Sequence, residues 1–407
     1  MRAKPLFFCL LVCLLAGCRK EVSDTIPRFT EPARTDDSGS MGNAFTEYQR
    51  IGLSAAKLDQ SMLFRGNYTP QMKKTIVAAL SKDITELKLS QRRPCKFRFE
   101  PIGPFGSRPE HAGWQILGKC LQWRIELAVK HDDPVSATSD LIVGTQFGWD
   151  LTGGGASDAA VGIAIINQCR IAFAPSMNKL SAVALQNLAR NIERILTNAP
   201  SIDQCLANER QNMLVAVDSV VNMRKEAMLN EKLWDDFGVK LGPLGNDIAK
   251  ALKLIKPEGA SQWFKDWAQE AATETELVTA AAKLPTQERQ EWPKLTMANR
   301  PWGMLSRVFF RSGRAVLAMH DEALARTRLL AILAESLAAV KAKQAAPMGI
   351  QAIPQPIRTD PYTGKPFIYQ AAGTDFKLYS VGANLRDDGG QTDESYTAPD
   401  LKVEFEN

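Results

Sequence analysis

Oxygen-bearing side chains gather near the C-terminus, where they could bind a metal ion. Calcium takes six to eight oxygen ligands in a flexible geometry. The oxygen donors of this segment are Asn384, Asp387, Asp388, Asp393 and Glu394. Nearby glycines would permit turns that aim carbonyl oxygens inward, but the alternating Asp-x-Asp-x-Asp-Gly pattern of an EF-hand is missing. The segment therefore predicts either a weak structural calcium site or a solvated acidic turn that closes a hairpin.

A second candidate chemistry is nucleophilic catalysis by Ser54, which precedes Lys57 in a Ser-x-x-Lys spacing. This spacing is similar to that of penicillin-binding proteins, in which the lysine helps the serine to attack. Ser176-Met177-Asn178 could pass for their second element, but the third, Lys-Thr-Gly, is missing from the sequence. Ser54 also lies in an amphipathic helical segment. A serine hydrolase is therefore the least favoured function, and we predict that the protein is not an enzyme.

Three further groups of residues are interpreted as structural. Gly153-Gly154-Gly155 could cradle an anion before a helix, but no strand precedes it, so we predict a turn with Ser157 as N-cap. The runs His131-Asp132-Asp133 and His320-Asp321-Glu322 predict solvated helix surface, with metal binding as the alternative.

The N-terminus has the parts of an export signal. Arg2 and Lys4 precede an apolar run of about a dozen residues, as in secretory signals, and this run is shorter than the roughly 20 residues of a membrane-spanning helix. It ends in Leu15-Ala16-Gly17-Cys18, which resembles the lipobox of bacterial lipoproteins. The resemblance implies removal of residues 1–17 and acylation of Cys18, which would hold the protein to a lipid bilayer. The alternative is a plain cleaved signal with an incidental cysteine. Arg19, where inner-membrane lipoproteins carry Asp, favours the periplasmic face of the outer membrane.

The composition limits the other partners. The formal net charge is +5 and falls to +3 when residues 1–17 are removed. Without a concentrated basic run, we expect no nucleic-acid partner. The most apolar internal stretch, 159–166, is followed by Asn167, Gln168 and Arg170, so it predicts a buried helix and not a membrane span.

Four cysteines remain after the signal: Cys95, Cys120, Cys169 and Cys205. An even number in an oxidising compartment is compatible with two disulfides. Pairing of sequence neighbours (Cys95 with Cys120, Cys169 with Cys205) is the favoured connectivity, and four unpaired thiols are the alternative. Zinc is not expected, because no Cys-x-x-Cys spacing occurs.

The elements that must position these residues are mainly helices. Residues 18–42 are polar and contain Pro27 and Pro32, and we expect a disordered tether. Residues 43–300 predict a helical bundle or irregular α-solenoid-like body, and 301–407 a long helix followed by a small α+β module with a short antiparallel sheet. The predicted helices are 44–62, 70–89, 112–131, 134–150, 157–173, 179–197, 201–228, 244–254, 260–283 and 302–344; the predicted strands are 367–370, 376–381 and 401–405. Asp132-Asp133-Pro134 marks the break before one helix, and Gly373 lies in the turn between the first two strands, as expected of a hairpin. In the last long helix, Leu330, Leu333, Leu337 and Val340 form one apolar face that predicts core packing.

The C-terminal region also carries a recognisable string. Asp360-Pro361-Tyr362-Thr363-Gly364-Lys365-Pro366 is followed by Leu378-Tyr379-Ser380-Val381-Gly382-Ala383 and by Asp387-Asp388-Gly389-Gly390. It resembles the end of the major pseudopilin of type II secretion systems, where a long helix leads to a small sheet and a calcium-binding loop. The chain is also similar to uncharacterised exported proteins of planctomycete-like bacteria. A pseudopilin begins with a polymerising apolar helix, whereas this chain has a lipobox, so the resemblance does not imply filament assembly.

These observations predict a membrane-anchored envelope lipoprotein that acts as a non-catalytic structural or partner-binding platform for other envelope proteins. The C-terminal resemblance gives the alternative of an accessory component of a type II secretion or pilus-like system.

Overall fold

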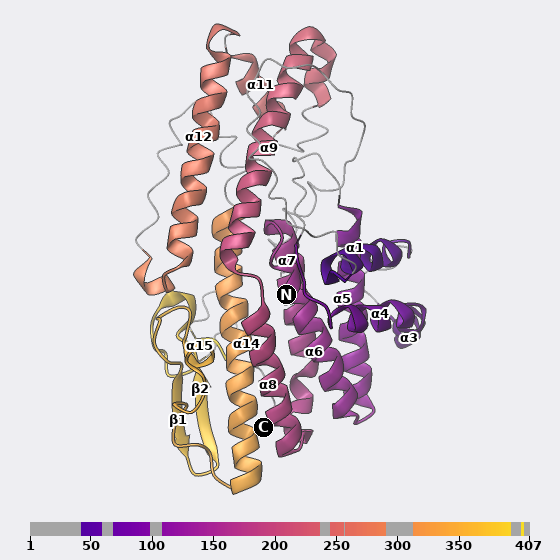
Figure 1. Ribbon diagram of the computed structural model, residues 1–407, viewed down its shortest axis with the longest axis vertical. Coiled ribbons are helices and arrows are strands. Elements are labelled where there is room, and N and C mark those ends of the chain that lie inside the picture. The colour runs from indigo at the N-terminus through magenta and orange to yellow at the C-terminus, as the bar shows by residue number, and fades with distance from the viewer. Residues whose placement is uncertain are drawn as a thin grey trace.

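The fold is mainly α-helical with one small antiparallel sheet, as predicted, over the residues that the structure describes. The structure is a computed structural model, and it describes residues 42–58, 68–97, 108–236, 245–255, 257–289, 312–391 and 400–402. Its long helices run roughly along the long axis of the molecule, and the sheet lies beside the last long helix (Figure 1). The predicted signal peptide and almost all of the predicted tether fall outside the described residues.

The helical body is built from successive helices that share one apolar core. Its elements are α1 (Ala44–Ala55), α3 (Pro70–Ala79), α4 (Ser81–Ser90), α5 (Pro109–Lys130), α6 (Pro134–Leu151), α7 (Ala156–Phe173), the 3-10 turn η2 (Ala174–Lys179) and α8 (Ala182–Asn198). The core is rich in aromatic side chains, among them Trp114, Trp123 and Phe147, which are at most 2% exposed. These large rings bury much apolar surface, which is the dominant favourable contribution to folding.

Local sequence signals explain where most of these helices begin. The side chains of Asn43, Thr69, Asp133 and Ser181 each accept a hydrogen bond from a backbone N–H in the first turn of the helix that follows. Such caps satisfy N–H groups that have no partner inside the helix. α7 is different, because its N-cap is Gly155 and the Asp158 carboxylate accepts the Gly155 N–H. The prediction of Ser157 as N-cap is therefore wrong; Ser157 is exposed one residue inside the helix.

Glycines allow two pairs of helices to pack with their backbones in contact. A Cβ atom on Gly113 of α5 would overlap with the backbone of Gly52 in α1, and one on Gly162 of α7 would overlap with the Gly148 carbonyl of α6. Only glycine fits where backbones approach so closely.

α7 is the central helix of the body and packs against α5, α6, α9 and α14. By length and composition alone, Ala156–Lys179 could cross a membrane, and 56% of its most apolar window is buried inside the protein. Within it, Val161, Ile163, Ile165 and Ile166 are each at most 5% exposed. The prediction of a buried helix over 159–166 is therefore confirmed.

An arm with its own small core continues from the body. It consists of α9 (Ile202–Leu229), the 3-10 turn η3 (Glu231–Trp234), α11 (Gly245–Lys253) and α12 (Pro257–Ala282). α9 and α12 pack side by side and extend beyond the other helices at one end of the molecule (Figure 1). Trp234, Phe264 and Trp267 fill the space between them and are at most 5% exposed.

The C-terminal region joins the body through α14 (Ser312–Lys343). This long helix packs against α8 and α7, and its Leu329, Ile332 and Leu333 belong to the core of the body. After it come α15 (Gln355–Arg358), β1 (Ile368–Ala372), β2 (Asp375–Tyr379) and the 3-10 turn η7 (Gly382–Asn384). β1 and β2 pair antiparallel, with Ile368 opposite Tyr379 and Ala372 opposite Asp375, around a turn in which Gly373 has φ of 65°. The predicted hairpin and its turn glycine are thus confirmed.

The main differences from the predicted elements are local. The single helix predicted over 70–89 is divided at Leu80, a buried residue whose backbone departs from helical geometry (φ −95°, ψ 5°). In place of the third predicted strand, Leu401 forms an isolated bridge with Ser380, and 403–405 fall outside the described residues.

Candidate functional site

The predicted calcium loop follows the hairpin, and its acidic side chains bind backbone and side-chain donors of the loop itself. The Asp387 carboxylate accepts hydrogen bonds from the Tyr379 hydroxyl at 2.9 Å and from the Gly389 N–H at 3.0 Å. Asn384 donates from its amide to Asp388 at 2.9 Å. Gly389 and Gly390 have φ of 72° and 76°, the left-handed region that favours glycine. Asp393 and Glu394, the other two predicted ligands, lie outside the described residues.

Asp400 is a third acidic group at this loop among the described residues, beside Asp387 and Asp388, and it was not predicted from the sequence. It is 1% exposed, and its Oδ2 accepts the N–H groups of Asp388 at 3.1 Å and of Gly390 at 2.7 Å. Its other oxygen, Oδ1, is buried without a hydrogen-bond partner in the described part of the chain. Burial raises the pKa of Asp400, and the nearby carboxylates of Asp388 and Asp387 add to this rise.

A buried carboxylate oxygen of this kind needs a proton, an ordered water or a cation, since leaving it unpaired is costly. The carboxylates of Asp387 and Asp388 lie near enough to Asp400 to raise its pKa, so the loop concentrates negative charge at this oxygen. Within the described ranges, no group of three or more His, Cys, Asp or Glu side chains is arranged to hold a metal ion. A complete site would thus need carbonyl oxygens or the loop residues 392–399 as well.

The motif before the loop has a structural explanation. Asp360, 2% exposed, accepts the Tyr362 N–H at 2.9 Å and the Ser380 hydroxyl at 2.8 Å. Ser380 also accepts the Gly382 N–H, and its backbone pairs with Leu401. Asp360 thus ties the turn before β1 to the end of β2, which places the acidic loop. Burial raises the pKa of Asp360.

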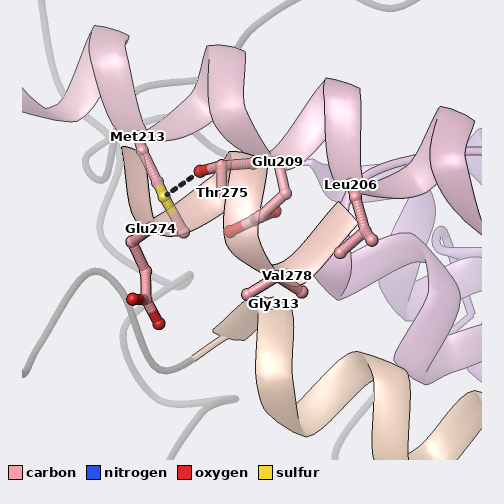
Figure 2. A pocket seen from close by; sticks show the side chains of 7 residues that line it. All are labelled: Leu206, Glu209, Met213, Glu274, Thr275, Val278 and Gly313. Atoms are coloured by element: carbon pink, nitrogen blue, oxygen red, sulfur yellow. Dashed lines mark hydrogen bonds between the residues drawn. The ribbon is translucent and has the colours of Figure 1, made fainter. Parts of the chain in front are cut away.

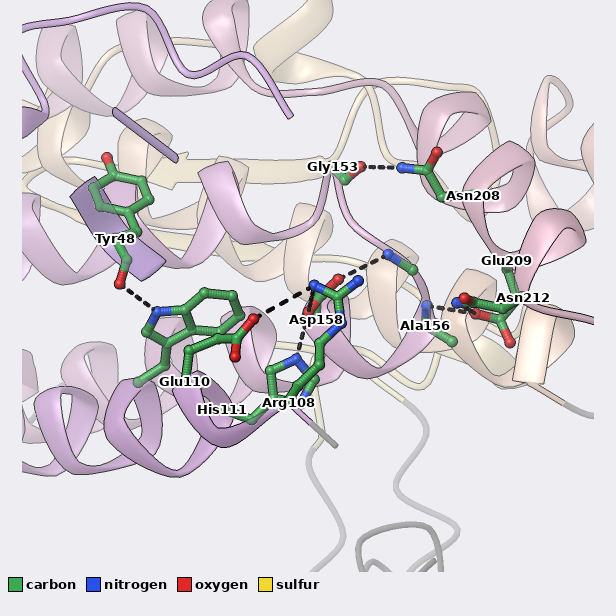
Figure 3. Close-up of polar contacts among 12 residues, drawn as sticks. Tyr48, Arg108, Glu110, His111, Gly153, Ala156, Asp158, Asn208, Glu209 and Asn212 are labelled. Carbon is green, nitrogen blue, oxygen red and sulfur yellow. Dashed lines mark hydrogen bonds and ion pairs between the residues drawn. The ribbon is translucent and has the colours of Figure 1, made fainter. Parts of the chain in front are cut away.

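A second cluster of charged residues lies where α5, α7 and α9 meet (Figure 3). Asp158 of α7 contacts His111 Nε2 at 2.5 Å and the Arg108 guanidinium at 3.7 Å. Arg108 is also 3.8 Å from Glu110. Because Asp158 also caps α7 through the Gly155 N–H, a single carboxylate holds the start of α5 against the start of α7.

The third side of this junction comes from α9. The Glu209 carboxylate accepts the Ala156 N–H at 2.9 Å, and the Asn208 amide donates to the Gly153 carbonyl at 2.8 Å. The Gly153–Gly155 turn is therefore enclosed by side chains and does not present its N–H groups to an anion. Gly153 allows the turn to pack closely against Pro200, because a Cβ on Gly153 would overlap with the side chain of Pro200.

A histidine–aspartate pair can serve as a base in nucleophilic catalysis only if a nucleophile lies within hydrogen-bond reach. No serine hydroxyl or cysteine thiol is hydrogen-bonded to His111 in the part of the chain that the structure describes. The pair packs against Trp114 instead, with ring centroids 5.2 Å apart. The arrangement joins α5 to α7.

Asp150, at the end of α6, is a buried carboxyl group whose pKa is strongly altered. It is 8% exposed and accepts the Tyr48 hydroxyl of α1 at 2.6 Å. Burial raises its pKa from 3.8 to about 7, although the hydrogen bond from Tyr48 opposes this change. Trp114 supports the same region by donating to the Tyr48 carbonyl at 2.8 Å. The pair joins α1 to α6 inside the core.

The predicted serine constellation is not assembled as a pocket. Ser54 is exposed in the last turn of α1, and Lys57 is exposed just beyond the helix end. Ser176 lies in η2 and is buried, with 1% of its surface exposed. Neither described pocket is lined by Ser54, Lys57 or Ser176.

The two histidine-containing runs have different surroundings. Asp132 is exposed and 2.7 Å from Lys179 Nζ, as expected of solvated surface. Asp321 is instead 4% exposed and forms an ion pair with Arg289 at 2.5 Å, so the prediction of solvated surface is wrong there. Burial alone would raise the pKa of Asp321, but hydrogen bonds with His320 and Arg289 outweigh it and lower the pKa. This pair joins the segment after α12 to α14.

The four described cysteines are free thiols, so the favoured neighbour pairing is not formed. Cys120, Cys169 and Cys205 are fully buried on α5, α7 and α9 respectively. Burial raises the pKa of all three, to about 12 for Cys120. Since the thiolate is the reactive form, we expect these buried thiols to have low reactivity.

A small internal cavity lies between α9, α12 and the start of α14 (Figure 2). Its lining includes Met213, Thr275 and Glu274, and the Thr275 hydroxyl lies 3.6 Å from the Met213 sulfur. Glu274, 3% exposed, pairs with Arg314 at 2.7 Å. The volume of about 10 Å³ has room for roughly one water molecule and excludes organic ligands.

Comparison of this chain with protein-family models, with curated proteins and with solved structures finds no match. The functional interpretation therefore depends on the residues and their geometry.

Proposed function

We propose that the protein is an exported lipoprotein, anchored through acylated Cys18 at the periplasmic face of the outer membrane, whose helical body is a non-catalytic structural or partner-binding platform. The observation that carries the proposal is the sequence Leu15-Ala16-Gly17-Cys18 after a basic start and an apolar run. Acyl chains on this cysteine and on the new N-terminus would together give stable membrane attachment, which a single chain does not.

The start of the folded body supports this arrangement. Asn43 is 7% exposed, and its amide donates to the Lys96 carbonyl at 2.6 Å and accepts the Lys96 N–H at 2.9 Å. The next residue donates its N–H to the Pro94 carbonyl. The body is therefore fixed from residue 43, and the residues between it and Cys18 could span at most roughly 80 Å.

The interior of the body supports a structural role. The charged clusters around Asp158, Asp321 and Asp360 each join separate elements through hydrogen bonds with backbone or side chains. Buried ion pairs often give a fold its specificity without adding to its stability. α14, which corresponds to the long helix before a pseudopilin module, has its apolar residues in the core of the body. Its packing favours a platform over a filament subunit.

Acylation is tested by expressing the full chain in a Gram-negative host with an alkyne-bearing palmitate analogue. Cys18→Ser should abolish labelling and release the protein from the membrane fraction. Cys13→Ser is the matched control, since it changes a cysteine in the same leader and should leave labelling intact. Labelling that survives Cys18→Ser would refute the anchor. Ester or amide hydrolysis that disappears in Ser54→Ala would refute the non-catalytic platform.

The unpaired oxygen of Asp400 supports a second proposal, that the C-terminal loop binds calcium as a structural ion. Asp400 Oδ1 would supply one ligand, and backbone carbonyl oxygens together with the predicted donors Asn384, Asp387, Asp388, Asp393 and Glu394 would supply the others, because the described carboxylates alone do not form a metal-binding group. A bound divalent cation would neutralise this acidic turn and stabilise the loop against the hairpin. Extracellular calcium modules bind with dissociation constants of about 0.1–1 mM.

Hydrogen–deuterium exchange on the full chain gives a local measure of this binding. Calcium at about 10 mM, well above the range for such modules, should slow exchange of the amides of residues 387–390, and magnesium should have less effect. Asp400→Asn should remove the calcium effect, whereas Asp375→Asn on the exposed part of β2 should preserve it. Equal exchange with and without calcium would refute calcium binding at this loop.

A further inference from the structure

An open groove between α4, α6 and α8 is lined by cations that have no acidic partner among the described residues. Its volume is about 300 Å³, and its lining includes Lys88, Arg92 and Arg194. No carboxylate lines it, and none of these three side chains forms an ion pair with any described residue. A volume of this size is at the lower end of the range for small-molecule sites.

The neighbouring basic residues make this arrangement distinctive. Arg50 and Arg93, which come from the adjoining α1 and the turn after α4, are paired with Glu86 and Glu47. The basic residues beside the groove thus form ion pairs with glutamates, whereas no carboxylate lines the groove itself. Three positive charges around one concave surface raise the local potential and concentrate anions there.

The floor of the groove is held in place by hydrogen bonds. Gln91, 9% exposed, donates to the Val143 carbonyl at 2.8 Å, and Gln146 donates to the Gln91 carbonyl at 3.0 Å. On one wall Lys88 Nζ donates to the Ser139 hydroxyl at 2.7 Å. These contacts join the end of α4 to α6 and fix the backbone that carries Lys88 and Arg92, which reduces the entropic cost of binding.

We propose that this groove binds a phosphate ester, either free in solution or as the headgroup of an anionic lipid. The planar guanidinium groups of Arg92 and Arg194 can each offer two N–H donors to phosphate oxygens, and Lys88 adds a compact positive charge. The glutamine amides and Ser139 provide polar partners for hydroxyl groups on the ester. Ile142 and Val143 give an apolar contact for its carbon chain. The proposal does not depend on lipid attachment at Cys18.

Two probes separate the two sources of phosphate. Glycerol 3-phosphate is titrated into the full chain by calorimetry, and binding to vesicles of phosphatidylglycerol is compared with binding to phosphatidylcholine. Arg92→Gln and Arg194→Gln should each weaken binding about tenfold, the loss expected for one charge-assisted hydrogen bond. Lys74→Gln, on the exposed face of α3 outside the groove, is the matched control and should leave the affinity unchanged.

The substituted side chains of Arg92 and Arg194 are exposed, so these variants should fold, and a thermal melt verifies that they do. Groove-dependent binding of glycerol 3-phosphate assigns a soluble ester. Groove-dependent binding of phosphatidylglycerol vesicles alone assigns a lipid headgroup; the N-terminal segment is common to all variants and cancels in the comparison. If neither probe binds, or if Lys74→Gln weakens binding as much as the groove variants, the proposal is overturned.

Discussion

Replacement of Asp150 by Asn should stabilise the protein at neutral and alkaline pH. Asp150 is buried, and its pKa is raised from 3.8 to about 7. At neutral pH the folded protein therefore either keeps a proton on Asp150 or holds a buried negative charge. An asparagine of nearly the same shape keeps an amide oxygen that can accept the Tyr48 hydroxyl, and it cannot ionise.

The size and sign of the effect follow from the two pKa values. Below about pH 4 the carboxyl is protonated in both the folded and the unfolded chain, so it costs nothing. As the pH rises from about 4 to about 7, the unfolded chain ionises first, and the free energy of unfolding falls by about 1.4 kcal/mol per pH unit. Above about pH 7 the cost stays constant near 4 kcal/mol. Between about pH 5 and pH 8 this single group should lower stability by about 2.5 kcal/mol.

Urea unfolding followed by tryptophan fluorescence at several pH values measures this difference. The gap between Asp150→Asn and the wild type should widen by about 2.5 kcal/mol from about pH 5 to about pH 8. The control Asp375→Asn, an exposed position on β2, should follow the wild-type pH dependence. A variant that is less stable than the wild type at pH 8, with an unchanged pH slope, would refute the argument. It would mean that the ionised carboxylate is well solvated or paired in the folded state.

Three other perturbations test the packing. Gly113→Ala should destabilise the protein by more than about 2 kcal/mol in thermal melts, because overpacking outweighs the roughly 1 kcal/mol gain in helix propensity. The control is Gly313→Ala on α14, where the nearest atom to a new Cβ is 3.6 Å away, and it should be neutral or stabilising. Arg289→Met should cost about 3–5 kcal/mol, because it removes the cation that pairs with the buried Asp321 carboxylate, and the double variant Arg289→Met, Asp321→Leu should recover much of that loss in urea unfolding. The three fully buried thiols should resist alkylation in the folded protein and react on unfolding, and a disulfide detected by mass spectrometry would contradict the free thiols of the structure.

The amino-acid sequence determined most of the local structure, because helix periodicity and capping act over a few residues. Asp133 before Pro134 predicted the start of α6, and Gly373 predicted the hairpin turn, and both are confirmed. The apolar positions of the last long helix predicted a core face, and Leu330 and Leu333 are indeed buried. The proposed lipobox likewise depends on consecutive residues, and it lies outside the described part of the chain.

The tertiary structure alone decided which polar residues are buried and what they contact. Asp321 and Asp158 lie on helices among residues of mixed polarity, and nothing in their neighbours shows that Arg289 or His111 will cover them. Asp400 was missed for the same reason, since it meets the acidic loop across a gap of ten residues. The phosphate groove depends on α4 and α8 approaching α6, and no short window of sequence contains Lys88 and Arg194 together. Contacts between distant segments are set by how helices pack, and single-sequence patterns carry no information on that packing.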